Sequence, residues 1–174
     1  AGIASSASAM SALALCLCSI ENKLFSSLSN ASDFFNKASY VARLGSGSAS
    51  RSVYGGLVLW GKYDEINESS NEFAVPLREN IHPNFATLHD AILIVSDQEK
   101  KVSSTKGHSL MHSHPFEKAR FEQARANMKV LLSALKDGDI PQFIEVVENE
   151  ALSLHAMMMT SKESFLLMEP ATIH

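Results

Sequence analysis

The order of the expected elements predicts an α+β fold. Two helical patterns open the chain, two strand-like runs follow, and a third apolar run precedes a polar loop and three more helices. Because strands and helices do not alternate regularly, a doubly wound parallel sheet is disfavoured. The 174 residues, 45% of them hydrophobic, suffice for one large or two small domains with a core. We expect two domains, residues 1–85 and 86–174, with the boundary near "NIHPNF".

Two helices are expected in the first 45 residues. Apolar side chains recur every three or four residues over 5–28, which is the period of one helix face. The alanines and serines of this segment indicate close packing against a neighbouring element. A second helix is expected over about 31–44. The candidates for its N-cap are Ser29, Asn30 and Ser32.

Three strands are expected in the middle of the chain. "GGLVLWGKY" (55–63) has a Gly-Gly entry followed by an apolar run, and "NEFAVPLREN" (71–80) is a weaker candidate. "IHPNF" (81–85) is a turn or short linker. "DAILIVSD" (90–97) is a short apolar run between polar residues, which indicates a buried strand.

Helices dominate the last third of the chain. A polar loop over 98–115 ends at a proline that suits the first turn of a helix over 116–135. Asp139 can cap a further helix that runs to about residue 158. A last helix is expected over 161–168, capped by Thr160 or Ser161.

The composition excludes some classes of partner. The net charge of -4 leaves no global basic field for nucleic acid or an acidic membrane surface, so any anion must bind locally. No apolar run reaches the roughly 20 residues of a membrane span. Cys16 and Cys18 lie two apart in a helix, where their side chains diverge, so we expect two buried thiols and no disulfide. Reduced cysteines favour a cytoplasmic setting.

The segment "AGIASSASA" is a candidate anion site. Gly2 permits an unusual backbone, Ser5 and Ser6 carry hydroxyls, and a helix begins there. The free N–H groups and dipole of a helix start attract anions. Serines that merely cap an ordinary helix would give the same pattern.

The segment "LGSGSASRSVYGG" (44–56) is the second candidate. Its glycines allow tight backbone turns, and its serines offer hydroxyls on little side-chain bulk. Arg51 can clamp a phosphate with two parallel hydrogen bonds, with Ser46 and Ser48 beside it. The alternative is a flexible linker, although linkers seldom join an apolar helix to a strand.

The third candidate is "KKVSSTKGHSLMHSHP" (100–115). Ser103 and Ser104 can contact a further phosphate or a nucleotide. The same segment holds three histidines, at positions 108, 112 and 114, but no carboxylate comes before Glu117. We therefore expect solvated loop histidines and no metal site.

These segments together resemble a known family. "GIASSASAMSALAL" resembles the phosphate loop and helix of the GHMP small-molecule kinase superfamily. "ARLGSGSASRSVYGGLVLW" is more specific and is similar to the diphosphomevalonate decarboxylase family. "AILIVSDQEKKVSSTKG" and "DIPQFIEVVENEALSLHAMM" are similar to later parts of that family. The resemblance covers essentially the whole chain in order.

The resemblance implies a fold and a reaction. The fold would combine a ribosomal-protein-like β/α domain with a ferredoxin-like domain, incomplete at both ends here. The reaction would be the ATP-dependent decarboxylation of 5-diphosphomevalonate to isopentenyl diphosphate in isoprenoid biosynthesis, with Mg²⁺. The tertiary hydroxyl is phosphorylated first, and loss of that phosphate drives loss of the carboxylate. Alternatives are a related kinase acting on mevalonate or its monophosphate, or a non-catalytic nucleotide-binding module.

The resemblance also implies roles for individual residues. The residues matching the ATP-phosphate loops are Gly2, Ser5, Ser6, Ser103 and Ser104. Those matching the substrate's diphosphate and carboxylate end are Ser46, Ser48 and Arg51. The family's catalytic aspartate is expected beyond residue 174, so none is assigned here. The chain opens without methionine and closes without a capping element, so we expect an inactive fragment of a longer protein, which by resemblance is a homodimer.

Overall fold

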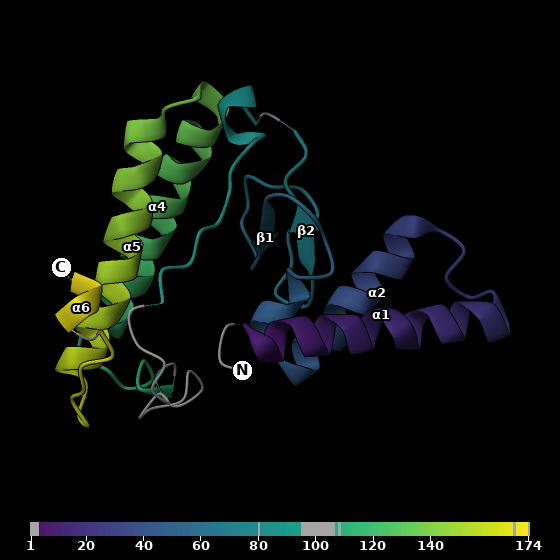
Figure 1. Ribbon diagram of the computed structural model, residues 1–174, viewed down its shortest axis with the longest axis horizontal. Helices are drawn as coiled ribbons and strands as arrows, with labels where there is room; N and C mark the ends of the chain where they lie inside the picture. Colours follow the sequence, from purple (N-terminus) through teal and green to yellow (C-terminus); the bar gives the residue numbers. More distant parts are fainter. Residues whose placement is uncertain (1–3, 80, 95–106, 108, 169, 174) are drawn as a thin grey trace. The chain divides into compact units, whose positions relative to one another are not determined.

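The chain folds into two compact units, Ala1–Glu79 (unit 1) and Asn80–His174 (unit 2) (Figure 1). The computed structural model describes residues 4–79, 81–94, 107, 109–168 and 170–173. The regular elements of these residues are helices and one small antiparallel sheet, so the fold is α+β.

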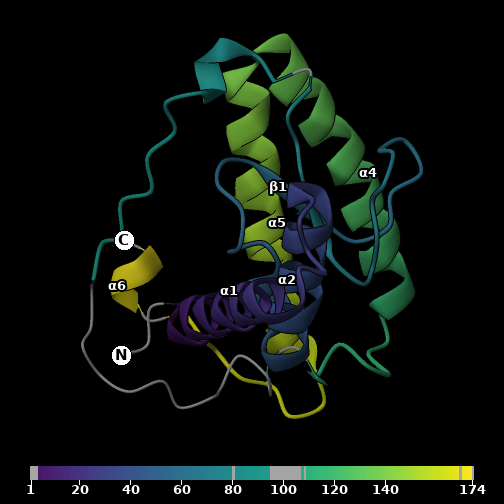
Figure 2. The same ribbon diagram turned by 90° about the vertical axis from the view of Figure 1, so that its right-hand side faces the viewer.

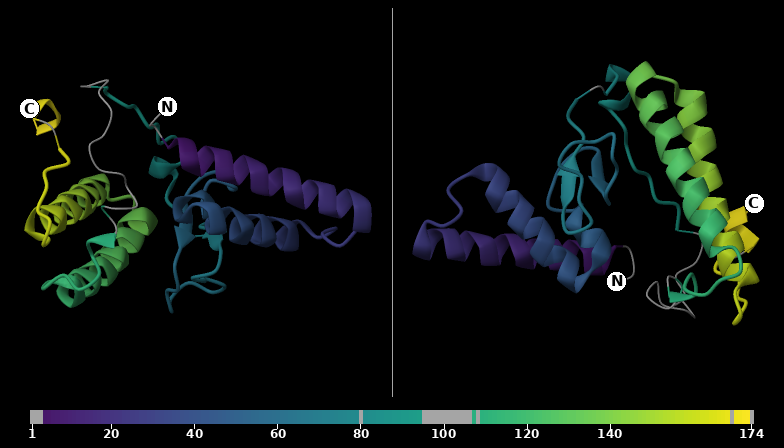
Figure 3. Two further views of the ribbon diagram at one scale, coloured as in Figure 1. Left: turned by 90° about the horizontal axis from the view of Figure 1, so that it is seen from below. Right: turned by 180° about the vertical axis from the view of Figure 1, so that it is seen from behind.

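Unit 1 begins with two helices that lie side by side (Figure 3). The helix α1 spans Ser5–Phe25 and α2 spans Ala31–Gly45, which confirms both sequence predictions. Asn30 is the N-cap of α2, and its Oδ1 accepts a hydrogen bond of 2.8 Å from the Ser32 N–H. The helix α1 ends before residue 28 because Ser26 adopts the left-handed conformation, with φ 53°.

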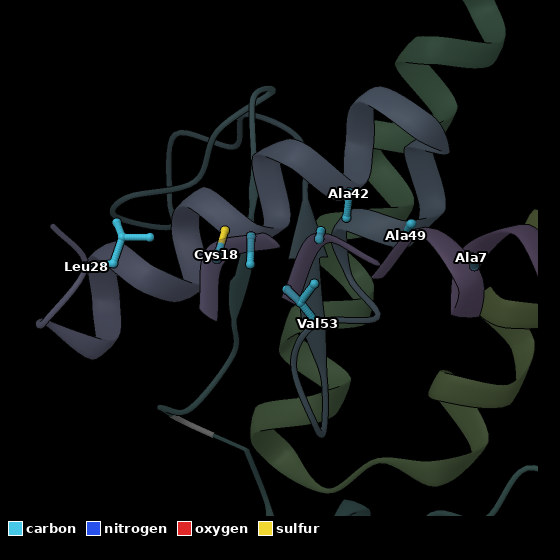
Figure 4. Packing of buried hydrophobic residues seen from close by; sticks show 8 residues of the cluster. Ala7, Cys18, Leu28, Ala42, Ala49 and Val53 are labelled. Atoms are coloured by element: carbon cyan, nitrogen blue, oxygen red, sulfur yellow. The ribbon is translucent and has the colours of Figure 1, made fainter. Parts of the chain in front are cut away.

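The core of unit 1 is built from small side chains (Figure 4). Small residues let the backbones of α1, α2 and the following turn approach one another closely, at a cost in apolar area per residue. The buried cluster consists of Ala7, Ala14, Cys18, Leu28, Ala38, Ala42, Ala49 and Val53.

A two-stranded antiparallel sheet completes unit 1. β1 spans Val58–Trp60 and β2 spans Ala74–Pro76, so two of the predicted strands are confirmed in shortened form. The register pairs Trp60 with Ala74, and β2 also contacts α2. The sheet therefore connects to the core through the end of β2 that holds Ala74.

Unit 2 is a helical hairpin (Figure 2). The helix α4 spans Glu117–Asp137 and α5 spans Ile140–Thr160. Gly138, at φ 78°, ends α4, and Asp139 caps α5 as predicted by accepting from the Gln142 N–H at 3.0 Å. A short 3₁₀ turn, η2 at Pro83–Phe85, packs on the hairpin through an aromatic contact with α5.

Two predictions for unit 2 are wrong. Residues 91–94 of the expected strand have no regular structure and are exposed, because the described part of unit 2 contains no strand that could pair with them. The expected helix over 161–168 is absent as well. Ser161 is extended and its hydroxyl donates to the Met158 carbonyl, while Ser164 is left-handed at φ 36°. The last helix described, α6, spans Pro170–Ile173.

The cysteine prediction holds in part. Both thiols are free, as expected, but only Cys18 is buried and Cys16 is exposed. The two side chains diverge on α1, so burying one exposes the other. Within the described residues, no helix is both long and apolar enough to cross a membrane.

Candidate functional site

The segment Ser46–Ser52, here called the serine turn, is an ordered and packed element. Ser46 is extended, and Gly47–Ser50 form a 3₁₀ helix, η1. The Ala49 N–H donates to the Ser46 carbonyl at 2.9 Å, and the Arg51 N–H donates to the Ser48 carbonyl at 3.2 Å. Ala49 and Ser50 are completely buried, so the linker alternative is wrong.

The serines of the turn divide into two kinds. The Ser50 hydroxyl is buried and donates to the Gly47 carbonyl at 2.7 Å, so its role is structural. Ser48 is exposed and Ser46 is half-buried, with their hydroxyl oxygens 3.5 Å apart. These two hydroxyls are less buried than that of Ser50, and their assignment to the substrate stays a prediction.

Arg51 leaves the turn as an exposed cation. Its guanidinium carbon lies 6.0 Å from the centre of the Trp60 ring, which is a cation–π distance. None of the carboxylates in the described ranges forms an ion pair with Arg51, whereas Arg43 is bound to Glu72 at 2.9 Å. The Arg51 guanidinium thus lies beside the Trp60 ring, and no carboxylate of the described residues neutralises its charge.

The two glycines beside the turn are required for space rather than for backbone conformation. Neither Gly45 nor Gly47 has a positive φ, which corrects the expectation of glycine-dependent bends. A Cβ on Gly47 would lie 2.8 Å from Cη2 of Trp60, and one on Gly45 would overlap Met10. The sequence could not identify these neighbours, because they come from β1 and α1.

The start of α1 is an uncapped helix N-terminus. Ala4 occupies the N-cap in the left-handed conformation, with φ 48°, and no side chain in the described part of the chain forms a cap hydrogen bond there. Ser5 and Ser6 are exposed, and the Ser8 hydroxyl donates to the Ser5 carbonyl rather than capping an N–H. The capping alternative is therefore wrong for the described serines. Gly2 lies outside the described residues.

The fold brings the first two candidate segments together within unit 1. The helices α1 and η1 are in contact, and Ala7 of α1 shares a buried cluster with Ala49 of η1 (Figure 4). Met10 of α1 packs where α2 ends at Gly45. The serine turn and the uncapped start of α1 are consequently neighbours, although about 40 residues separate them in the sequence.

The third candidate segment is described only at its end. Ser103, Ser104 and His108 lie outside the described residues. His112 is exposed, as predicted, but His114 is buried. Its Nδ1 accepts from the Phe116 N–H at 3.1 Å, and its Nε2 lies 3.2 Å from the Thr160 hydroxyl. The described residues contain no cluster of side chains suited to a metal ion.

Two titratable groups in or beside the core of unit 1 have raised pKa values. Burial raises the pKa of Tyr54, although the positive charge of Arg78 acts in the opposite direction, and the Tyr54 hydroxyl donates to Asn36 at 3.0 Å. Burial likewise raises the pKa of the Cys18 thiol. Burial therefore favours the neutral form of both groups.

Two further residues shape the site and escaped the sequence reasoning. Ser39 of α2 is fully buried and bonds both the serine turn and β2, while Trp60 of β1 contacts Gly47 and Arg51. The sequence could have indicated that Ser39 is buried, because it lies three residues before Ala42, on the face of α2 that carries small residues. For Trp60 no local signal exists.

Comparison with known families assigns both parts of the chain. Residues 1–72 match the diphosphomevalonate decarboxylase-like N-terminal domain, and residues 91–171 match the mevalonate 5-diphosphate decarboxylase C-terminal domain. The chain belongs to the diphosphomevalonate decarboxylase family. The serine turn and the start of α1 both fall in the first match, and α4 and α5 fall in the second.

Relatives in this decarboxylase family cover most of the chain. A diphosphomevalonate decarboxylase of Gibberella zeae is 34% identical over 160 residues, 90% of this chain and 38% of the relative. That of Saccharomyces cerevisiae is 32% identical over 165 residues, 92% of this chain and 38% of the relative. The chain therefore spans about two fifths of the length of these relatives.

Solved decarboxylase structures match over nearly the full chain. A mevalonate diphosphate decarboxylase from Legionella pneumophila is 27% identical with a TM-score of 0.76, over 99% of this chain and 50% of that one. The enzyme from Staphylococcus aureus is 31% identical with a TM-score of 0.72, over 97% of this chain and 47% of that one.

Proposed function

We propose that this chain is part of an enzyme that decarboxylates 5-diphosphomevalonate at the expense of ATP. The products would be isopentenyl diphosphate, ADP, phosphate and carbon dioxide. One observation carries the proposal: a chain of the decarboxylase family packs the serine turn against the start of α1, and Arg51 of that turn has no ion-pair partner among the described residues. Two adjacent anion sites suit a reaction in which a phosphoryl group passes between two phosphorylated molecules.

The serine turn would bind the substrate. Arg51 offers a planar fork of N–H donors, which suits two oxygens of a diphosphate or carboxylate. The Ser46 and Ser48 hydroxyls would add donors on the same element. Cation–π contact with Trp60 limits the directions that the guanidinium can take, which reduces the entropy lost on binding.

The start of α1 would bind the ATP phosphates. Its free N–H groups and the small exposed side chains of Ser5 and Ser6 allow phosphate oxygens to reach the backbone. Gly2, Ser103 and Ser104 are proposed to extend this site. Mg²⁺ fits the same place, because it is commonly held by few protein ligands together with substrate phosphates, and serine hydroxyls suit it. Bound there, it would neutralise phosphate charge.

The residues of the two segments bind and orient rather than move protons. Neither the serine turn nor residues 1–10 contain a carboxylate or histidine. The base that accepts the proton of the tertiary hydroxyl would therefore come from another part of the full-length protein. For phosphoryl transfer, positioning and charge neutralisation account for most of the catalysis, so these segments would still contribute substantially to the rate.

The finer features of the full-length protein remain part of this proposal. We propose the domain pair of the GHMP kinase superfamily, a cytoplasmic location and a homodimer. Sedimentation of the full-length protein tests the dimer, because a single species at monomer mass would contradict it.

The experiment that tests the function is a product assay on the full-length protein. Incubation with ATP, Mg²⁺ and 5-diphosphomevalonate labelled at the carboxylate should release labelled carbon dioxide together with ADP. Formation of ADP and a phosphorylated product without carbon dioxide would identify a kinase instead. Mevalonate and its monophosphate serve as control substrates and should release no carbon dioxide.

A further inference from the structure

We propose that Ser39 is a positioning residue that fixes the direction of Arg51; the inference rests on the proposed binding role of the serine turn. Ser39 lies on α2 and has no exposed surface. Its hydroxyl donates to the Ser50 carbonyl at 2.7 Å and accepts from the Ala74 N–H at 2.8 Å. The Ser39 side chain therefore joins α2 to η1 and to β2, through Ser50 and Ala74, which lie 11 and 35 positions further along the sequence.

The bond to Ser50 acts on the peptide that leads into Arg51. Because a peptide unit is planar, the Ser50 carbonyl and the Arg51 nitrogen turn together. The opposite side of this plane is also held, since the Arg51 N–H donates to the Ser48 carbonyl at 3.2 Å. Fixing the carbonyl thus sets the direction in which the Arg51 side chain leaves the turn.

The bond to Ala74 acts on the aromatic face beside Arg51. Ala74 is fully buried and pairs in register with Trp60 on β1. The Trp60 ring in turn lies beside the Arg51 guanidinium and against Gly47. The Ser39 hydroxyl therefore couples the arginine and its aromatic support to the same point of α2.

Ser39 would act through these partners and not on the ligand. Its hydroxyl proton and an oxygen lone pair are both occupied by backbone groups, and the residue is inaccessible. Alanine at this position would leave a buried carbonyl and a buried N–H without this partner. The peptide before Arg51 could then rotate, and the guanidinium would lose its fixed direction.

The test compares three variants of the full-length protein. Ser39→Ala removes the hydroxyl, and Ser39→Cys keeps the shape of the side chain with a somewhat larger thiol that forms only weak hydrogen bonds. Ser32→Ala changes an exposed serine on the same helix and is the matched control. Calorimetry measures the Kd for inorganic pyrophosphate, kinetics give KM for 5-diphosphomevalonate and for ATP, and thermal unfolding gives the Tm.

We expect both Ser39 variants to bind pyrophosphate about tenfold more weakly and to show a parallel rise in KM for 5-diphosphomevalonate. The KM for ATP should change less, and Ser32→Ala should match the wild type. The measurements are made well below the Tm of each variant, so that loss of folded protein does not contribute. Ser39→Cys keeps the test decisive if Ser39→Ala does not fold.

Two outcomes would overturn the inference. A lower Tm with an unchanged Kd for pyrophosphate would show that Ser39 only stabilises the fold. Binding by Ser39→Cys at the wild-type level would show that volume matters and hydrogen bonding does not. Failure of the proposed function is distinguishable, because the wild type would then release no carbon dioxide while the pyrophosphate comparison still decides the role of Ser39.

Discussion

The helices of unit 1 meet through alanine, cysteine and serine, whereas α4 and α5 of unit 2 meet partly through long polar side chains. Between α1, α2 and η1 the buried residues are mostly small, and buried hydroxyls bond backbone groups. Along α4 and α5, Arg120 and Asn127 both bond Glu150, and Gln123 bonds Asn149. Close backbone packing leaves few alternative positions, while long side chains can adjust. Unit 1 is thus the better support for a binding site.

The largest difference between the two units is expected when an arginine is replaced by alanine. Arg51→Ala in the full-length protein should lower kcat/KM for 5-diphosphomevalonate, because a charged contact with the substrate is lost. The expected loss of transition-state stabilisation is about 2–4 kcal/mol. Arg125→Ala, an exposed arginine on α4, is the control and should leave kcat/KM unchanged. Steady-state kinetics decide the point. Equal values for Arg51→Ala and wild type would remove Arg51 from the binding site.

Glycine substitutions probe the space beneath the serine turn. Gly47→Ala places a Cβ against the rigid Trp60 ring, so we expect a loss of stability of about 1–3 kcal/mol and a raised KM. Gly55→Ala is the matched control, because nothing lies within 4 Å of its new Cβ and its φ is not positive. Urea unfolding of the two variants measures the difference. If both variants unfold at the same urea concentration as the wild type, the space between Gly47 and Trp60 accommodates a methyl group and the prediction is wrong.

Local signals explain what the sequence could predict. Apolar periodicity and caps such as Asn30 and Asp139 identified α1, α2, α4 and α5, because both act within a few residues. The strand expected over 90–97 failed for its described part, since a strand depends on a partner elsewhere in the chain.

The candidate site also has features that the sequence predicts and features that depend on residues distant in the sequence. Composition alone drew attention to the serine turn and to Arg51. It could not show that Ser50 is buried and structural while Ser48 is exposed, because that depends on which side of η1 faces the helices α1 and α2. Ser39 escaped for the same reason, since both its partners are distant in sequence.

The ion pair of unit 2 should make its stability depend on pH. Burial raises the pKa of Glu150, but hydrogen bonds from Arg120 and Asn127 outweigh it, so the pKa is lowered overall. A lowered carboxyl pKa stabilises the fold above the unfolded value of about 4.3, and this stability is lost as pH falls through the folded value. The pair is partly exposed, at 14% and 33% for its side chains, so we expect about 1 kcal/mol.

Glu150→Gln tests that assignment. Thermal unfolding of wild type and variant between about pH 7 and pH 3 should show a difference near neutrality that narrows in acid, because protonation removes the same charge from the wild type. Glu148→Gln, an exposed carboxyl on the same helix, is the control. A difference that stays constant across this range would mean that the Glu150 charge contributes no stability.

The smallest effect is expected in the exposed apolar run of unit 2. Leu93 is 88% exposed, so Leu93→Ser in the full-length protein should change the free energy of unfolding by no more than about 0.5 kcal/mol. Val146→Ser, at a position that is 7% exposed on α5, is the contrasting variant and should cost several times more, because a buried side chain loses its apolar contacts and a hydroxyl is buried. Urea unfolding compares the two. A loss at Leu93 as large as that at Val146 would show that other residues of the full-length protein cover the exposed apolar run and complete the core of unit 2.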